Sequence, residues 1–147
     1  MLNQELHYLL MVGYNLSNRA ITSRIAGTGL LPGQPKILEY LMEHDGCTQK
    51  EIGEGCGLDK STIAVLLPKL DKAGLIRREP CVTDRRFCHV YLTEEGQELG
   101  AQVHQIFAYW EEKVWGSLHP SERHALPASF TALLRHSRAL STRPQHC

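Results

Sequence analysis

The sequence predicts a mainly helical protein with a small β-hairpin, and three observations carry that prediction. Residues 48–57 have the pattern of a short capped helix that ends in glycines. The segment from Leu58 to Gly96 is patterned as a helix, a strand, a basic tip, a second strand and the start of another helix. Amphipathic segments lie on both sides of it. This order predicts a winged helix-turn-helix flanked by N- and C-terminal helices.

The first helix of the helix-turn-helix is expected to begin at a capping box. Thr48 and Glu51 are spaced so that each side chain can accept a hydrogen bond from the other's backbone N–H. The glycine-rich residues 55–57 supply the turn that two steeply crossing helices need. Asp59 is a suitable N-cap for the second helix. That helix therefore begins near Lys60, where free backbone N–H groups favour phosphate.

The second helix has two distinct faces. Its apolar residues recur at i, i+3, i+4 and i+7, and they are Ile63, Leu66, Leu67 and Leu70. The opposite face has smaller or basic side chains that suit a DNA groove, namely Ser61, Val65, Lys69 and Lys72. Pro68 lies inside the helix and lacks the N–H of a helical hydrogen bond, so it is expected to destabilise or kink it.

The tip of the predicted hairpin is basic, with Asp84, Arg85 and Arg86 side by side. From Asp59 to Arg86, seven Lys and Arg residues oppose four Asp and Glu residues, which leaves a net charge of +3. The whole chain is neutral. Because exposed charges act over about one Debye length, a polyanion responds to the local surplus.

Both ends of the chain have apolar helical stripes. The N-terminal stripe consists of Leu2, Leu6, Leu9, Gly13, Leu16 and Ala20. A long helix after Thr93 has acidic residues in its first turn, which suits the helix dipole, and its stripe is Leu99, Val103, Ile106, Phe107, Trp110 and Val114. A last helix begins near Pro120. These helices have more apolar surface than one small winged helix covers, so they form either a larger monomeric core or a core shared by two chains.

These residues resemble the MarR (multiple antibiotic resistance) family of transcriptional regulators. The resemblance rests on TQKEIGEGCGLDKSTIAVLLPKLDKAGLIRR, on TDRR with Asp84 and Arg86 in the family's D-x-R positions, and on HVYLTEEG. The segment LLPGQPKILEYL resembles the helix that precedes the helix-turn-helix in that family. The motifs extend from about Leu30 to Glu98, and the flanks agree in architecture.

The resemblance implies a single MarR-like domain over residues 1–147. The DNA-binding region would span 30–92, and dimerisation helices would span 1–25 and 93–141. The family resemblance implies a homodimer on double-stranded DNA, most often a repressor that a small-molecule effector releases from an inverted repeat. The expected DNA contacts are Lys60, Ser61, Thr62, Val65, Lys69, Asp84, Arg85 and Arg86.

In that arrangement the helix from about Asp59 to Ala73 lies in a major groove. The wing places Arg86 in the neighbouring minor groove, Asp84 holds it in place, and Arg85 contacts the DNA backbone. The family commonly binds small aromatic or anionic molecules between the dimer helices and the winged helix. The candidate lining residues are Tyr8, Met11, Tyr14 and Met42, each of which has a core position as its alternative.

Three alternatives remain open. Cys81 and Cys88 flank the tip and could face each other near several arginines, which favours a redox-responsive regulator of the same fold. His44 and His104 are the histidines to consider for a metal-responsive regulator, although the chain has no H-x-x-x-H pair and no metal site is expected. A winged helix can also bind a protein in place of DNA.

Other classes of function find little support in the sequence. It has no nucleophile elbow, no H-E-x-x-H motif and no paired acid and base, so we expect neither an enzyme nor a cofactor. The apolar runs are too short to span a membrane, and the N-terminus lacks the basic region of a signal peptide. Five cysteines without a signal peptide are typical of a reduced cytoplasmic protein.

Overall fold

The structure, a computed structural model, describes residues 1–141 and divides the chain into two compact units, Met1–Ala108 and the residues from Tyr109 onward. The helices and strands follow in the order η1 (Leu2–Gln4), α1 (Leu6–Ile25), η2 (Ala26–Thr28), α2 (Gln34–Glu43), β1 (Cys47–Thr48), α3 (Gln49–Cys56), α4 (Lys60–Lys72), β2 (Ile76–Pro80), β3 (Cys88–Leu92), α5 (Glu94–Trp115) and α6 (Pro120–Ser141). The predicted fold class, mainly helical with a small β-wing, is confirmed.

The core of the first unit lies between α2, α3, α4 and the sheet. The stripe predicted for α4 is buried, and none of its four members is more than 7% exposed. The residues that pack with it from the other elements are Ile37, Leu38, Leu41, Ile52, Ile76, Val90 and Leu92. Burial of apolar surface is the main favourable contribution to folding, so this stripe fixes which face of α4 points outward.

Both predicted helix starts are confirmed. The Thr48 hydroxyl accepts from the Glu51 N–H at 3.2 Å, and the Glu51 carboxylate accepts from the Thr48 N–H at 2.7 Å. The Asp59 carboxylate accepts from the Thr62 N–H at 2.7 Å. Between the two helices, Gly57 has a φ of 66°, a left-handed conformation that glycine adopts without steric cost. The helix-turn-helix therefore forms where its local signals predicted it.

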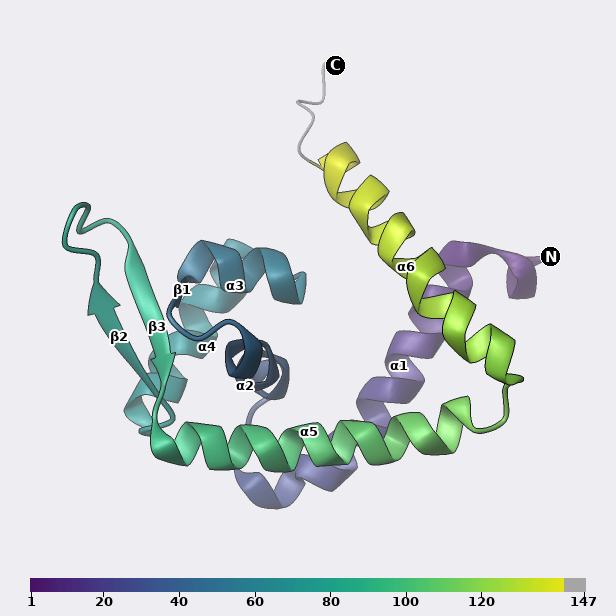
Figure 1. The fold of residues 1–147 in the computed structure, drawn as a ribbon, viewed down its shortest axis with the longest axis horizontal. Coiled ribbons are helices and arrows are strands. Elements are labelled where there is room, and N and C mark those ends of the chain that lie inside the picture. Colours follow the sequence, from purple (N-terminus) through teal and green to yellow (C-terminus); the bar gives the residue numbers. More distant parts are fainter. Residues whose placement is uncertain (142–147) are drawn as a thin grey trace. The chain divides into compact units, whose positions relative to one another are not determined.

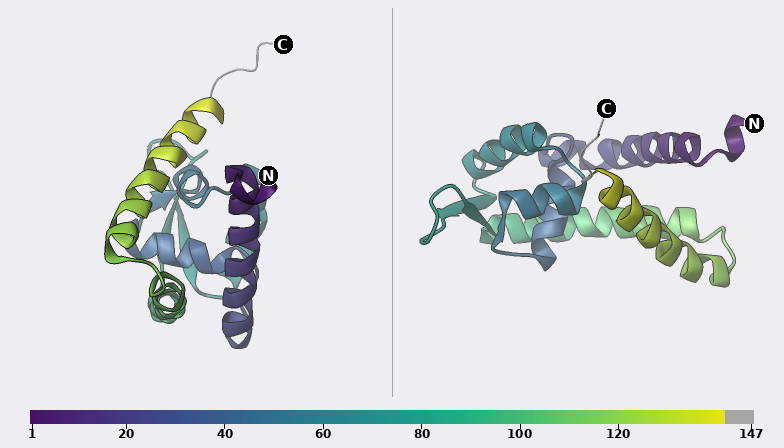
Figure 2. Two further views of the ribbon diagram at one scale, coloured as in Figure 1. Left: turned by 90° about the vertical axis from the view of Figure 1, so that its right-hand side faces the viewer. Right: turned by 90° about the horizontal axis from the view of Figure 1, so that it is seen from above.

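The sheet has the strand order β1-β3-β2, and both pairs are antiparallel. In the hairpin, Ile76 pairs with Leu92 and Pro80 with Cys88. The hairpin extends beyond α2, α3 and α4 in Figure 1 and again in the view from above in Figure 2. It therefore forms a wing next to the helix-turn-helix. The third strand, β1, was not predicted from the sequence.

The register of the hairpin corrects the expected position of its two cysteines. Cys88 pairs with Pro80, whereas Cys81 donates its N–H to the carbonyl of Phe87 at 2.9 Å and so lies one position further out. Successive side chains along a strand point to opposite faces. Cys81 and Cys88 therefore do not face each other across the hairpin, and that prediction was wrong.

The base of the wing is fixed to the first turn of α5. Thr93 donates its N–H to the Leu75 carbonyl at 3.1 Å and its hydroxyl to the Gly74 carbonyl at 2.6 Å. The helix comes so close to Leu75 that a Cβ at Gly96 would overlap the Leu75 carbonyl oxygen. Only a residue without a side chain allows this approach, so Gly96 determines where the wing joins the helix.

Helix α1 uses two different faces. Its C-terminal half buries Ile21 and Ile25, each 4% exposed, and both line one hollow together with Pro35 and Leu58 of the winged helix. The predicted stripe of Leu6, Leu9 and Leu16 lies on another side of the helix, and these leucines are 48–57% exposed. The first unit therefore leaves the apolar stripe of α1 uncovered.

The second unit contains the end of α5 and all of α6. Arg123 of α6 donates to the Glu112 carboxylate of α5 at 3.1 Å. No described residue of α6 is buried, and its exposed leucines are Leu126, Leu133, Leu134 and Leu140. None of the helices described between residues 1 and 141 is long and apolar enough to cross a membrane.

Candidate nucleic-acid interface

The outward face of α4 presents most of the residues predicted to contact DNA. Lys60, Ser61, Val65 and Lys69 are exposed, whereas Thr62 is half-buried. Val65 is 55% exposed although it is apolar and lies in the middle of a helix. Ala64 and Pro68 are exposed beside it. The face thus has an apolar centre between a lysine near each end.

Ser61 has a restricted hydrogen-bonding role. Its hydroxyl donates to the Asp59 carboxylate at 2.8 Å, so the hydroxyl proton is already used within the protein. The backbone N–H of Thr62 donates to the same carboxylate and holds the pKa of Asp59 below its usual value. The Ser61 oxygen is consequently available as an acceptor and faces outward at the start of the helix.

Helix α4 runs through Pro68 to Lys72. Because proline has no N–H, the carbonyl four residues earlier, that of Ala64, receives no helical hydrogen bond from it. Both residues are on the exposed side of the helix, where water or a donor on a ligand can satisfy that carbonyl. The structure gives no further reason for a proline at this position.

The two members of the D-x-R element at the wing tip bind each other. Arg86 donates from Nε to both Asp84 oxygens, at 3.0 and 3.1 Å, and from Nη2 to Oδ2 at 2.7 Å. The backbone N–H of Arg86 also donates to Oδ1 at 3.0 Å. Hydrogen bonds from Arg86 hold the pKa of Asp84 below its usual value. The Arg86 side chain is 84% exposed against 29% for Asp84, so the carboxylate orients a guanidinium that faces solvent.

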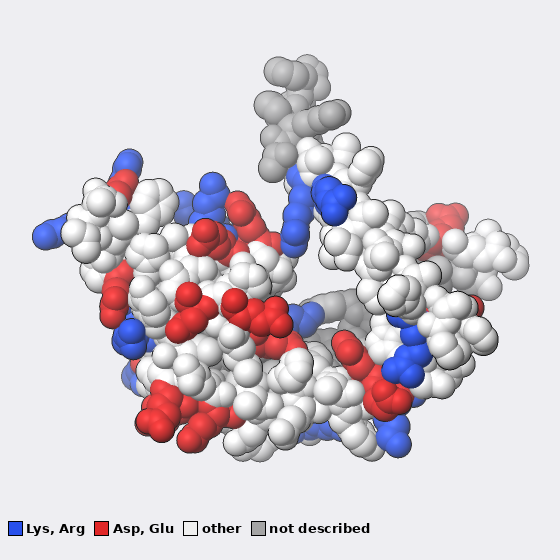
Figure 3. All heavy atoms as spheres, viewed as in Figure 1, with Lys and Arg blue, Asp and Glu red and all other residues white. Residues whose placement is uncertain are grey.

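The positive surplus of this region is partly neutralised by ion pairs. Arg78 pairs with Asp71 at 3.0 Å, and Arg77 pairs with Glu79 at 3.1 Å. Among residues 1–141, the basic residues of the region that form no ion pair are Lys60, Lys69, Lys72 and Arg85. Figure 3 shows Lys and Arg atoms at the outer end of the wing. The unpaired positive charge therefore lies on α4 and the tip.

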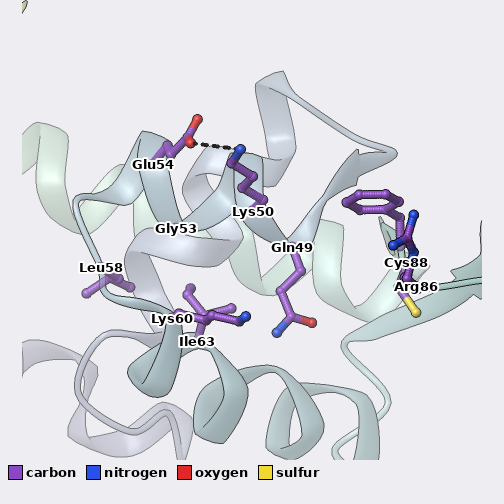
Figure 4. A pocket seen from close by; sticks show the side chains of 10 residues that line it. Gln49, Lys50, Gly53, Glu54, Leu58, Lys60, Ile63, Arg86 and Cys88 are labelled. Carbon is purple, nitrogen blue, oxygen red and sulfur yellow. Dashed lines mark ion pairs between the residues drawn. The ribbon is translucent and has the colours of Figure 1, made fainter. Parts of the chain in front are cut away.

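A hollow of about 530 Å³ lies between the helix-turn-helix and the wing. Gln49 and Lys60 line one side of it, and Arg86 and Cys88 line the other (Figure 4). Lys50 is paired with Glu54 at 3.9 Å on its rim. The start of α4 and the tip of the wing thus border one concave surface.

The four candidate effector residues are not brought together. Tyr14 lines a hollow of about 230 Å³ between α1 and the start of α2, with Lys36 Nζ 5.3 Å from the centre of its ring. Met42 lines a different hollow, of about 580 Å³. Tyr8 and Met11 line neither of these two. Lys36 lines both hollows and was missed from the sequence, where nothing distinguishes it from a surface lysine.

The two histidines considered for a metal have other partners. His44 stacks on the Tyr40 ring with 4.2 Å between the ring centres, and its Nδ1 lies 3.1 Å from the Tyr40 carbonyl oxygen. His104 Nδ1 lies 3.0 Å from a Glu39 carboxylate oxygen. In the part of the chain that the structure describes, no group of three potential metal ligands comes together.

Comparison with known proteins points to one family. Residues 28–86 match the model of the MarR family. The HTH-type transcriptional regulator BilQ of Clostridium symbiosum (strain WAL-14163) is 28% identical over 104 residues, which are 71% of this chain and 72% of BilQ.

Two solved structures of a repressor extend the likeness to the flanking helices. CouR bound to a 23-mer DNA duplex has a TM-score of 0.78 at 25% identity, with 90% of this chain and 94% of CouR covered. CouR from Rhodococcus jostii RHA1 bound to p-coumaroyl-CoA has a TM-score of 0.80 at 20% identity, with 91% and 94% covered.

Proposed function

The chain belongs to the MarR family of transcriptional regulators, and from that premise we propose that it is a homodimeric repressor. In this proposal it binds an inverted repeat in double-stranded DNA, and a small-molecule effector releases it. The observation that carries the proposal is the shared hollow between Lys60 at the start of α4 and Arg86 at the wing tip. It is supported by CouR, a repressor of similar fold whose structure contains a DNA duplex.

We assign the contacts according to the chemistry of each exposed group. Lys60, Thr62 and Arg85 would contact phosphates, because they lie at a helix start and a hairpin tip. Ser61, Val65 and Lys69 would face base edges from the outward side of α4. Arg86 would enter a minor groove with Asp84 fixing its direction. With these assignments, the α4 side of the hollow contacts the major groove and the wing side contacts a minor groove.

The proposed effector site is the hollow next to Tyr14. An aromatic ring and an ammonium group at 5.3 Å suit a small molecule with an aromatic ring and an anionic group. A volume of about 230 Å³ lies below the usual range for drug-sized ligands, which favours a small effector. CouR, which has a similar fold, was solved bound to p-coumaroyl-CoA, and this supports the binding of a ligand.

A specific observation favours a second function, the binding of a protein. Val82 at the wing tip is fully exposed and Phe87 is 46% exposed, and exposed apolar groups are typical of protein interfaces. The four unpaired basic residues on α4 and the tip favour DNA. A mobility shift with random duplex DNA at low salt separates the two functions, because a protein-binding module would leave the duplex unshifted.

The main test of the proposed function is selection of bound duplexes from a random pool. We expect the selected sites to be inverted repeats with half-sites about one helical turn, roughly 10 bp, apart, because a two-fold dimer presents two α4 helices. A screen of aromatic anions should then find compounds that release the selected duplex. Selected sites without two-fold symmetry would contradict the dimeric arrangement.

A second prediction concerns Val65. An exposed valine on a groove-facing helix can contact the thymine methyl group. Replacing single thymines of the selected site by deoxyuridine, which lacks this methyl, should weaken wild-type binding roughly fourfold at one position per half-site. The same substitution should have no effect on Val65→Ala. If wild type tolerates deoxyuridine at every position, Val65 does not read a methyl group.

A further inference from the structure

Cys81 lies at the point where β2 ends and the wing tip begins. Its N–H donates to the Phe87 carbonyl at 2.9 Å, so Cys81 is opposite Phe87. His89 is two residues beyond Phe87 and therefore on the same face of β3. The diagonal neighbour of Cys81 across the hairpin is thus a histidine, within reach of a side chain.

The Cys81 thiol has partners in the wing tip and in β3. Its Sγ lies 3.2 Å from Thr83 Oγ1, and hydrogen bonding from the Asp84 backbone and the His89 ring contributes to lowering its pKa. His89 Nδ1 lies 2.9 Å from the Gly46 carbonyl oxygen. A carbonyl only accepts, so Nδ1 is the protonated nitrogen and Nε2 is left for the thiol. A nucleophile next to a base, with the base oriented by a third group, is the arrangement of an activated cysteine.

The charge state of Cys81 differs from that of Cys47 and Cys56. Hydrogen bonds from Thr83, Asp84 and His89 lower the pKa of Cys81 to about 6. The pKa of His89 is raised, chiefly by its hydrogen bond with Cys81. The Gly46 carbonyl and the negative charge of Glu51 raise it further. By contrast, burial raises the pKa of Cys47 to about 11 and raises that of Cys56. Near neutral pH, Cys81 is therefore largely a thiolate, and the raised pKa of the neighbouring His89 favours its protonated form.

We propose that Cys81 is a covalent modification site for α,β-unsaturated carbonyl compounds, with His89 as its positioning residue and proton source. The sulfur lone pair forms a bond to the β-carbon of the compound, and the π electrons move to give an enolate. The enolate takes the proton of the His89 imidazolium, which returns to neutral imidazole. The addition needs no oxidant and has no leaving group, and it uses the proton that the neighbouring histidine supplies.

The adduct would disturb the DNA-contacting tip, a consequence that rests on the proposed function. Cys81 is three residues from Asp84 and is bonded to Thr83. An added group on Sγ removes the bonds to Thr83 and His89 and requires space beside the D-x-R element. We therefore expect modification of Cys81 to loosen Arg86 and to weaken DNA binding.

The test is the reaction of the full chain with N-ethylmaleimide, an unsaturated imide, followed by mass mapping of each cysteine. At pH 7 a thiol with a pKa near 6 is roughly 90% thiolate, against roughly 1% for one near 9. Lower intrinsic nucleophilicity offsets most of this difference, so Cys81 should react about fourfold faster in the folded chain than in the chain unfolded by urea. Its rate should reach half its plateau near pH 6, whereas Cys47, which is half-buried and has a pKa of about 11, should be modified last.

Two variants test whether Cys81 reacts fast because its neighbours lower its pKa or only because it is exposed. Thr83→Val and His89→Gln should each move the midpoint of the Cys81 rate to higher pH while leaving Cys47 protected, which also reports that the chain is folded. A midpoint above pH 8 in wild type, or an unchanged midpoint in both variants, would overturn the proposal. Because labelling is measured without DNA, a chain that binds no DNA would refute the proposed function and leave this result intact.

The consequence for DNA has its own readout and control. Wild type labelled at Cys81 should bind the selected duplex more weakly than unlabelled protein, and Cys81→Ser should keep its affinity after the same treatment. Equal binding by labelled and unlabelled wild type would contradict the effect on the wing while the modification site stands.

Discussion

Replacing Leu9 of α1 by glutamate should convert the proposed dimer into monomers and reduce affinity for an inverted-repeat duplex by at least about 100-fold. Leu9 is 50% exposed on a face of α1 that does not contact the winged helix. If a second chain covers that face, the substitution buries a carboxylate without a partner. A monomer then contacts one half-site and loses the gain from two linked contacts, which is about 10²–10⁴.

Asn15→Glu is the matched control, since it adds the same charge to an exposed polar position of the same helix outside the stripe. Light scattering at micromolar concentration should give a dimer for wild type and Asn15→Glu and a monomer for Leu9→Glu. Leu16→Glu, two helical turns further along the same stripe, should also give a monomer. A Leu9→Glu protein that remains dimeric would show that the apolar stripe of α1 is not the contact between chains.

The parts of the fold that the sequence predicted well have local causes. The capping box of Thr48 and Glu51 and the N-cap of Asp59 act over three residues, so their spacing alone identifies them. The buried stripe of α4 repeats with the helix period and needs no knowledge of its partners. The Asp84–Arg86 pair is likewise two residues apart and closes within a single turn.

The parts that the sequence missed depend on contacts between distant residues. Strand β1 has two residues, Cys47 and Thr48, and exists because they pair with Val90 and His89. A pattern of two residues cannot indicate a strand. The opposite faces of Cys81 and Cys88 follow from a register that a shift of one residue would reverse.

The effector residues could not be selected from periodicity alone. The helical period shows that Tyr14 and the leucine stripe of α1 lie on different faces, but it does not show which face meets the winged helix. In the structure Tyr14 lines a hollow with Lys36, a residue that the sequence places on another helix without any distinguishing signal. The positions of the two helices, and not their patterns, determine that site.

Arg86→Ala should weaken binding to specific and random duplexes alike, by roughly tenfold per wing. The reason is that it removes a positive charge from the minor groove that does not distinguish one base from another. The dependence of log affinity on log salt should fall by about one per subunit. Duplexes with A·T-rich flanks should lose more than others, since narrow minor grooves concentrate negative potential. Arg85→Ala is the matched comparison, because it removes a proposed phosphate contact from the same tip, where Arg85 has no ion-pair partner in the described part of the chain, and leaves the Asp84–Arg86 pair in place.

The Asp84→Ala variant tests whether the orientation of the Arg86 guanidinium matters for DNA binding in addition to its charge. Its carboxylate holds the Arg86 guanidinium through both oxygens and accepts the Arg86 N–H. Asp84→Ala removes this support, which should weaken binding, and also removes a negative charge, which should strengthen it. We expect weaker binding in wild type but slightly tighter binding in an Arg86→Ala background, where only the charge effect remains. Tighter binding in both backgrounds, measured by mobility shift at one salt concentration, would mean that Asp84 serves the hairpin turn and does not aim Arg86 at DNA.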